Sequence, residues 1–342
     1  MSEIPRGAIR FNTDSNRLEV WNGSVWGEMQ LSTPNLGRNV DTEPGARGIF
    51  AGANPVDGGS DGSLNVVDYI NISSTGNSVA FGTRIGKGRR QIAAMADRTR
   101  AVFAGSYSPM GNTIDFVTIA STGDALDFGD TFSAGTDQNL TEATGISNST
   151  RGIMAGGRSP SVHDIISYVT IQSKGDALDF GDLTGAKRNC ASCQSPVRGI
   201  IGGGRNPSGT DLTGIEFITT ATLGDAQDFG DLTSGGQNIM GGGNGIRGIF
   251  AGGNPQTTAI EYITISSTGN STDFGDNTNA VSRMNTMMCS PTRAVMHGSA
   301  TPARSLSYVN IQTTGDAVNF GDITTDPDSN YNSGCSNAHG GL

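Results

Sequence analysis

The chain has few of the residues that build long helices and no long apolar run. Of its 342 residues only 3 are Lys and 7 are Glu, while 51 are Gly, roughly twice the usual share. Because Gly disfavours helix interiors by about 1 kcal/mol each, long helices are improbable and the composition predicts an all-β protein. Nowhere do about 18 apolar residues follow one another, and the first residues contain no apolar signal segment. We therefore expect neither membrane insertion nor a secretion signal.

Charged residues are also scarce, at 16% of the chain, and their balance is acidic. The hydrophobic share of 35% excludes a highly charged disordered chain, and Gly does not recur at every third position as in collagen. The formal net charge of −10 repels phosphate backbones, so nucleic acid is not an expected partner.

Cysteine and histidine are too few and too scattered to suggest a metal centre or a disulfide scaffold. Cys190-x-x-Cys193 lacks the second pair that a structural zinc site needs, and the segment 57–62 lacks the distal Glu of a calcium loop. We expect free, buried thiols, no metal and no cofactor. The residues concerned are Cys190, Cys193, Cys289, Cys335, His163, His297 and His339.

An internal repeat organises most of the sequence. Six segments open with Arg, continue with small and apolar residues, and end in Gly, at intervals of 46 to 53 residues. This interval is typical of a four-stranded propeller blade. The repeats start at Arg47, Arg100, Arg151, Arg198, Arg247 and Arg293.

Each repeat continues with an apolar run and then a Phe-Gly pair. In the run 260–265, Ile260 and Tyr262 lie on one face of the expected strand and Ile263 on the other, so both faces are apolar. Such a strand suits a blade sandwiched between two neighbours, although a β-solenoid or an open repeat array is the alternative. The Phe of the pair recurs at Phe81, Phe128, Phe180, Phe229, Phe274 and Phe320.

Strand counting leaves the closure of the ring open. Three strands are visible in six copies, but the pattern of a fourth, more variable strand occurs seven times, including residues 36–46 upstream and 330–338 at the end. Either terminal copy can complete the last blade. The Gly-Gly ends, the aromatic residues and the spacing resemble kelch repeats, although the Trp usual in the third kelch strand is absent. We therefore predict a six-bladed, kelch-like β-propeller over residues 36–342.

Residues 1–35 differ in composition and hold both Trp residues, Trp21 and Trp26. Alternating segments separated by turn sequences predict a three-stranded β meander. A unit of this size is too small for a core of its own. We expect it to dock on another protein through Trp21 and Trp26, or else to pack on the propeller.

The N-terminal stretch 5–26 resembles a short module of tail-fibre and other structural proteins of tailed bacteriophages. The downstream units, such as 114–130, are similar to repeats in virion proteins of marine phages of cyanobacteria and other ocean bacteria. The resemblance implies a particle component, assembled in the host cytoplasm, that contacts other virion proteins through residues 1–35. It leaves open whether the protein belongs to the tail or to the head of the particle, and whether it forms a homo-oligomer.

The sequence supports an enzymatic function less well than a structural one. Gly243-x-Gly245-x-x-Gly248 matches a dinucleotide fingerprint by letter but leads into an expected strand rather than a helix. The repeated Asp-Phe-Gly-Asp turns pair carboxylates as glycosidases do, yet a catalytic pair is needed once. A turn cap, or a contact with the Arg that opens each repeat, explains the repetition better.

Residues that vary between repeats are the candidates for recognition. The loops between first and second strands would gather at one rim of a closed ring, and they carry groups suited to stacking or anion contact. We expect a virion protein without enzymatic activity, chiefly a tail-fibre or adhesin component that recognises a host-surface glycan or protein. A capsid decoration protein is the alternative, and a glycan hydrolase a remote one. The candidate receptor-contact residues are Tyr107, Arg158, His163, Arg205 and Arg304.

Overall fold

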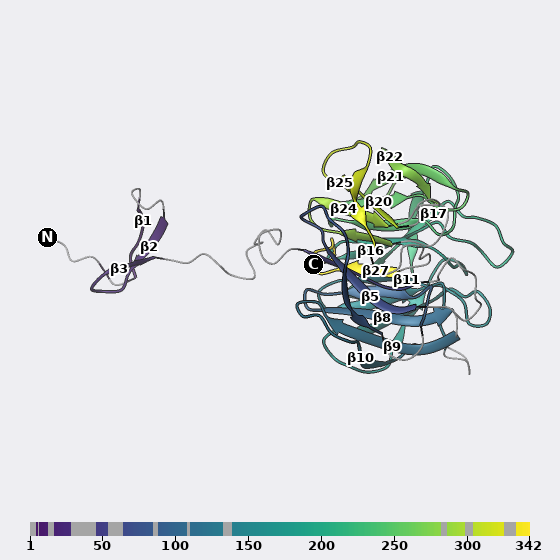
Figure 1. Cartoon of the computed structure of the whole chain (residues 1–342), viewed down its shortest axis with the longest axis horizontal. Helices are drawn as coiled ribbons and strands as arrows, with labels where there is room; N and C mark the ends of the chain where they lie inside the picture. The colour runs from purple at the N-terminus through teal and green to yellow at the C-terminus, as the bar shows by residue number, and fades with distance from the viewer. Residues whose placement is uncertain are drawn as a thin grey trace. The chain divides into compact units, whose positions relative to one another are not determined.

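The computed structural model describes residues 5, 7–12, 17–28, 46–53, 64–84, 88–107, 110–132, 139–281, 286–297, 304–324 and 333–342. The chain forms two compact units, Met1–Thr42 and Glu43–Leu342. All regular structure in the described ranges is β (Figure 1). No helix of those ranges has the length and apolar character needed to cross a bilayer.

The N-terminal unit is an antiparallel sheet of β1 (Ile9–Asn12), β2 (Arg17–Trp21) and β3 (Trp26–Glu28) in that order. This confirms the predicted meander. Trp21 and Trp26 are cross-strand partners with ring centroids 5.5 Å apart, and the Arg10 guanidinium lies 4.2 Å from the Trp26 ring centroid. Both Trp side chains are half-buried within this small unit, and their role in docking stays a prediction.

The second unit is a six-bladed β-propeller, as predicted. Each blade is a four-stranded antiparallel sheet, whose strands we call inner, Arg, middle and outer. The inner strands contact one another in an unbroken cycle and so close the ring. In this order of strands, blade I consists of β27 (Ser333–Ser336), β4 (Arg47–Ala53), β5 (Leu64–Asn71) and β6 (Val79–Thr83), and blade II of β7 (Ala93–Ala96), β8 (Arg100–Tyr107), β9 (Met110–Thr118) and β10 (Leu126–Asp130). Blade III consists of β11 (Thr144–Ser147), β12 (Arg151–Ala155), β13 (Ile165–Thr170) and β14 (Leu178–Asp182), and blade IV of β15 (Ala191–Gln194), β16 (Arg198–Gly202), β17 (Gly214–Thr219) and β18 (Gln227–Asp231). Blade V consists of β19 (Met240–Gly243), β20 (Arg247–Ala251), β21 (Thr257–Thr264) and β22 (Thr272–Val281), and blade VI of β23 (Thr286–Cys289), β24 (Arg293–His297), β25 (Ser305–Asn310) and β26 (Val318–Asp322).

The variable fourth strand of each repeat belongs to the blade that follows it. It pairs with the next Arg strand through a short hairpin, in which a polar side chain three residues before the Arg caps the turn. Asp97 Oδ1, for example, accepts hydrogen bonds from the backbone N–H groups of Thr99 and Arg100. The equivalent caps are Asn148, Ser195, Asn244 and Ser290.

Ring closure uses the C-terminal copy of this strand. The yellow strand β27 pairs with β4 of the first repeat, with Cys335 opposite Ile49 (Figure 1). Asn337 then accepts a hydrogen bond from the Arg47 N–H at 2.9 Å, as the hairpin caps do in the other blades. Of the two terminal segments that the sequence left open, the C-terminal one therefore closes the ring. Residues 36–45 lie outside the described residues.

The Arg that opens each repeat joins its blade to the next one. Its guanidinium lies over the aromatic ring of its own middle strand, as Arg198 does over Phe217 at 4.6 Å. Its Nη1 donates to a carbonyl at the end of the next middle strand, as Arg198 does to Ile265 at 3.0 Å. All six repeat-opening Arg residues bond in this way, the sixth returning from Arg293 to Ile72 and Ser73.

The apolar core lies between blades rather than within them. Phe116 and Phe128 of blade II pack edge to face at 6.0 Å, and the same cluster includes Met154 and Ile171 of blade III. The middle-strand aromatic and the Phe of the Phe-Gly pair make this edge contact in every blade. Both faces of each sheet are therefore apolar because both are covered.

Backbone hydrogen bonds also join the outer strands to their neighbours. The N–H of Gly315 donates to Phe274 O and that of Ala317 to Asp276 O, while Asp316 Oδ1 accepts from the Asp276 N–H at 3.0 Å. Equivalent bonds link all six blade pairs. The repeated Asp and Asn side chains are thus caps between blades. For the Asp-Phe-Gly-Asp turns the sequence suggested a turn cap or a contact with the repeat-opening Arg. In the described residues the second Asp of that turn, such as Asp276, receives the cap through its backbone N–H, and the repeat-opening Arg residues bond to carbonyls.

This close approach makes the Gly of the Phe-Gly pair irreplaceable. A Cβ added at Gly275 would lie 2.6 Å from the carbonyl carbon and oxygen of Gly315 in the next blade. We predict that Gly275→Ala lowers the free energy of unfolding by about 1–3 kcal/mol more than Gly315→Ala does, by overpacking. Gly315 is the matched control because its φ of +152° is close to the +148° of Gly275 and a Cβ there meets nothing within 4 Å. Equal losses in denaturant titrations of both variants would contradict the contact.

Candidate functional site

The loops between Arg and middle strands lie on the same side of the ring as the connections between blades, because every blade has the same strand order. We call this side the loop face. Tyr107, Arg158, His163 and Arg205 lie here in the three consecutive blades II to IV. Arg304 precedes β25 of blade VI, three blades away from Arg158 around the ring.

Tyr107 and Arg158 are brought together by the fold. The Arg158 guanidinium lies 5.2 Å from the Tyr107 ring centroid, and that of Arg90 lies 5.0 Å from the same ring. Tyr107 also donates its backbone N–H to Arg90 O. The aromatic ring therefore contacts two cations, and each such contact contributes about 0.5–1 kcal/mol at an exposed site.

Glu142 stands between Arg158 and Arg188. Its Oε2 accepts a hydrogen bond from Arg188 Nη1 at 2.7 Å and lies 3.7 Å from Arg158 Nε. The carboxylate is nearly buried, while the two Arg side chains keep 27% and 23% of their surface exposed. One carboxylate thus serves two solvent-accessible guanidinium groups.

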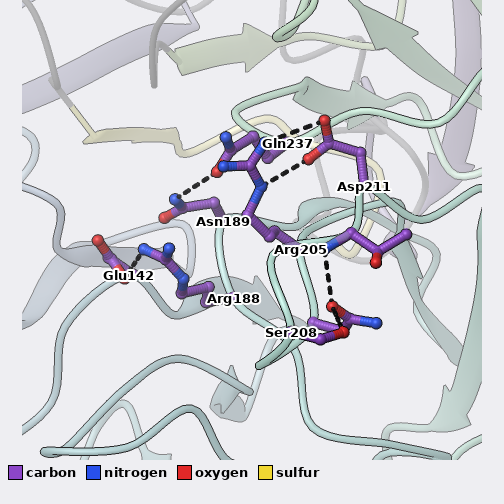
Figure 2. Close-up of polar contacts among 9 residues, drawn as sticks. Glu142, Arg188, Asn189, Arg205, Ser208, Asp211 and Gln237 are labelled. Carbon is purple, nitrogen blue, oxygen red and sulfur yellow. Dashed lines mark hydrogen bonds and ion pairs between the residues drawn. The ribbon is translucent and has the colours of Figure 1, made fainter.

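Arg205 is held in a separate network that Figure 2 shows. Its Nε and Nη2 bond to the two carboxylate oxygens of Asp211 at 2.8 and 3.2 Å, which raises the pKa of Arg205. Gln237 presents its amide oxygen to the same guanidinium at 3.0–3.2 Å when the amide is oriented to suit these donors. The charge of Arg205 is therefore neutralised within its own loop.

His163 and Arg304 do not join these networks. His163 is half-buried, and its burial lowers its pKa, so the imidazole is neutral at pH 7. Arg304 is exposed, and its carbonyl accepts a hydrogen bond from Ile323 N–H. Of the five candidates, the fold thus assembles Tyr107 with Arg158 and places the other three apart from them.

A row of backbone hydrogen bonds links four neighbouring blades on the loop face. Gln91, Glu142, Asn189 and Asn238 occupy equivalent positions in blades II to V, all with φ between 54° and 61°. The N–H groups of Glu142, Asn189 and Asn238 each donate to the carbonyl of the preceding member, as Asn189 does to Glu142 at 2.9 Å. Asn tolerates this left-handed conformation, whereas Glu and Gln adopt it rarely. The chain of bonds holds Glu142 in this backbone conformation.

The C-terminal residues enter the channel from the other side. The inner strands and His339 line a cavity of about 100 Å³. His339 is buried, with Nε2 bonded to Ala96 O at 2.7 Å and Nδ1 accepting from Gln194 Nε2 and Gly341 N–H at 3.0 Å each. Because Nδ1 accepts twice, the neutral Nε2–H tautomer fits this site. The tail closes this end of the channel.

The described residues contain no group of three His, Cys, Asp or Glu side chains that could hold a metal ion. The segment 57–62 lies outside them. All four cysteines are free and buried, and burial raises the pKa of Cys190 and Cys289 to about 12. Such thiols behave as small apolar side chains, as the sequence predicted.

Arg90, Glu142 and Arg188 were not among the predicted residues, because all three lie in the connections between blades. The sequence did contain one signal. The residue two positions before the inner strand has an amide side chain in blades II, IV and V, where it is Gln91, Asn189 and Asn238. Blade III differs from these blades because it has Glu142 at that position.

We predict that His339 makes stability depend on pH. Burial lowers its pKa from 6.5 to about 4, so below pH 6.5 the unfolded chain takes up a proton that the folded chain does not. Its contribution is complete above pH 6.5 and falls by about 3 kcal/mol as the pH drops to 4. Denaturant titrations of the wild type and His339→Gln measure it: the stability difference should be constant above pH 7 and shift by this amount at lower pH. A pH-independent difference would show that His339 does not titrate in this way.

No protein-family model matches the chain, and no curated protein matches it in sequence, so its function is argued from its residues and their geometry.

Proposed function

We propose that the chain is a surface protein of a phage particle that recognises the host cell through the loop face without enzymatic activity. The observation that carries this proposal is the assembly of Arg90, Tyr107, Arg158 and Arg188 around Glu142. These residues lie outside the pattern that the repeats share, and blades II to IV contribute them jointly. Residues that build the blade recur in it six times, whereas this group occurs once.

The sequence likeness to virion proteins supports the location on a particle. The N-terminal sheet is then the attachment module, and its two half-buried Trp residues supply the contact with another virion protein. Tyr and Trp are enriched in such contacts because they bury a large area with few rotatable bonds. In this arrangement the small unit anchors the chain and the propeller meets the host.

Binding of the labelled full-length chain to intact cells tests the recognition role. We expect saturable binding to susceptible marine cyanobacteria or other ocean bacteria and none to resistant strains, with no sugar released from isolated surface glycans. Released sugar would overturn the non-enzymatic role, and equal binding to resistant and susceptible cells would overturn recognition.

Labelling of particles with antibody and gold tests the location. We expect label at the tail tip; a label over the whole capsid would indicate a decoration protein instead. Trp21→Ala with Trp26→Ala should remove the chain from particles and leave cell binding intact. The matched control is Val25→Ala, since Val25 is an exposed apolar residue of the same unit. Normal incorporation of the double variant would contradict the anchoring role.

A further inference from the structure

The group of Arg90, Tyr107, Arg158, Arg188 and Glu142, which we call the arginine cluster, carries an excess of positive charge. Among the described residues, Arg158 and Arg188 share the one carboxylate of Glu142, and Arg90 lies over the same Tyr107 ring as Arg158. The protein as a whole has a formal net charge of −10. A local concentration of cations on an acidic protein favours anions at this site and repels them elsewhere.

The adjoining connection adds to this charge. Arg84 and Arg89 share the single carboxylate of Asp115, with Arg84 Nη2 at 2.8 Å from Oδ1 and Arg89 bonded to Oδ2. Burial, together with the positive charge of Arg84, lowers the pKa of Arg89 to about 10 despite Asp115. Arg89 directly precedes Arg90 in the chain, so two guanidinium groups that share one carboxylate adjoin the cluster.

Arg158 and Arg188 have hydrogen-bond donors that the described residues do not use. A guanidinium carries five N–H donors. Among the described residues, Arg188 makes one side-chain hydrogen bond, to Glu142. Arg158 Nε is buried without an acceptor within hydrogen-bond distance, and Thr141 Oγ1, next to Glu142, is also buried without a partner. Buried polar atoms without partners are rare and call for an explanation, of which a bound ligand is one.

The donors are also held in place before any ligand binds. Stacking on Tyr107 restrains Arg158, and the row of backbone hydrogen bonds from Gln91 to Asn238 fixes Glu142, to which Arg188 is bonded. The two Arg side chains remain partly exposed, so a solute can reach them. Restraint of this kind reduces the entropy cost of binding.

We propose that the arginine cluster binds an anionic saccharide, with its acid group, a carboxylate or a phosphate, held between Arg158 and Arg188. This rests on the proposed function and names the chemistry of the surface that is recognised. Guanidinium groups pair with both kinds of acid through two parallel N–H bonds. The neighbouring loop 206–210 stands beside Arg188 through the backbone bonds between Arg188 and Arg205, and its exposed Ser208 hydroxyl suits a sugar hydroxyl. A nucleic acid fits less well, because a long polyanion would extend over the acidic remainder of the protein.

Calorimetric titration of the full-length chain tests this proposal. The probes are trigalacturonate, a phosphorylated trisaccharide, a neutral trisaccharide of the same size, and inorganic phosphate. We expect one acidic saccharide to bind at least tenfold more tightly than the neutral one, with affinity falling as salt increases. Competition by inorganic phosphate would indicate that the acid group is the main contact, and selective binding of one probe would distinguish carboxylate from phosphate. Equal affinity for acidic and neutral saccharides, or no binding of any acidic probe, would overturn the proposal.

Variants locate the site. Arg158→Gln and Arg188→Gln should each weaken binding of the acidic saccharide about tenfold or more, as expected for a charge-assisted hydrogen bond. Arg98→Gln is the matched control, because this exposed Arg bonds to Leu342 O at the opposite end of the channel and its loss removes the same charge. Thermal unfolding of each variant checks the fold. Unchanged affinity in both folded cluster variants would exclude this site.

The two proposals fail in different ways. If Arg158→Gln with Arg188→Gln still binds susceptible cells as the wild type does, the saccharide site is wrong and host recognition stands. If the wild type binds an acidic saccharide at the cluster but not susceptible cells, the site stands and host recognition is wrong.

Discussion

Each blade of this protein is apolar on both faces and has no core of its own, so its stability depends on the blade beside it. Three kinds of contact meet at every junction: an Arg that reaches the next middle strand, an edge contact of two aromatic rings within a shared apolar cluster, and backbone bonds from the outer strand to the next turn. The third also covers the outer strands, whose unpaired edges would otherwise invite association with other chains.

A junction of this kind has to be repeated until the last blade meets the first. The structure achieves this with ten C-terminal residues: β27 supplies the missing inner strand, Asn337 the turn cap, and His339–Leu342 the closure of one channel end. The opposite side of the ring is then free to vary. Differences between blades accumulate there, and the arginine cluster is one of them.

Much of this architecture could be predicted from the sequence, because the residues that make the junctions recur six times. Arg198, Phe229 and their counterparts revealed the number of blades, and the apolar runs showed that both faces are covered. The pairing of the inner strand was not predicted, although the polar residue three positions before five of the six Arg residues, such as Asp97, indicates a tight hairpin to it. The Asp-Phe-Gly-Asp turn was predicted to be structural, but the cap that it receives from the next blade depends on which turn that blade presents. The residues of the arginine cluster were found only in part: Tyr107 and Arg158 lie in variable loops, whereas Glu142 and Arg188 come together only when three blades stand side by side.

Closure of the ring by the C-terminal strand is the central claim, and shortening the chain tests it most directly. A chain ending at Ala338 keeps β27 and Asn337 but loses the tail, and a chain ending at residue 332 loses the strand as well. We expect the first to unfold in one cooperative transition at moderately lower denaturant concentration, and the second to lose that transition or most of its stability, because blades I and VI would each expose an apolar face. Equal stability and cooperativity of the two chains would show that the ring does not depend on this strand.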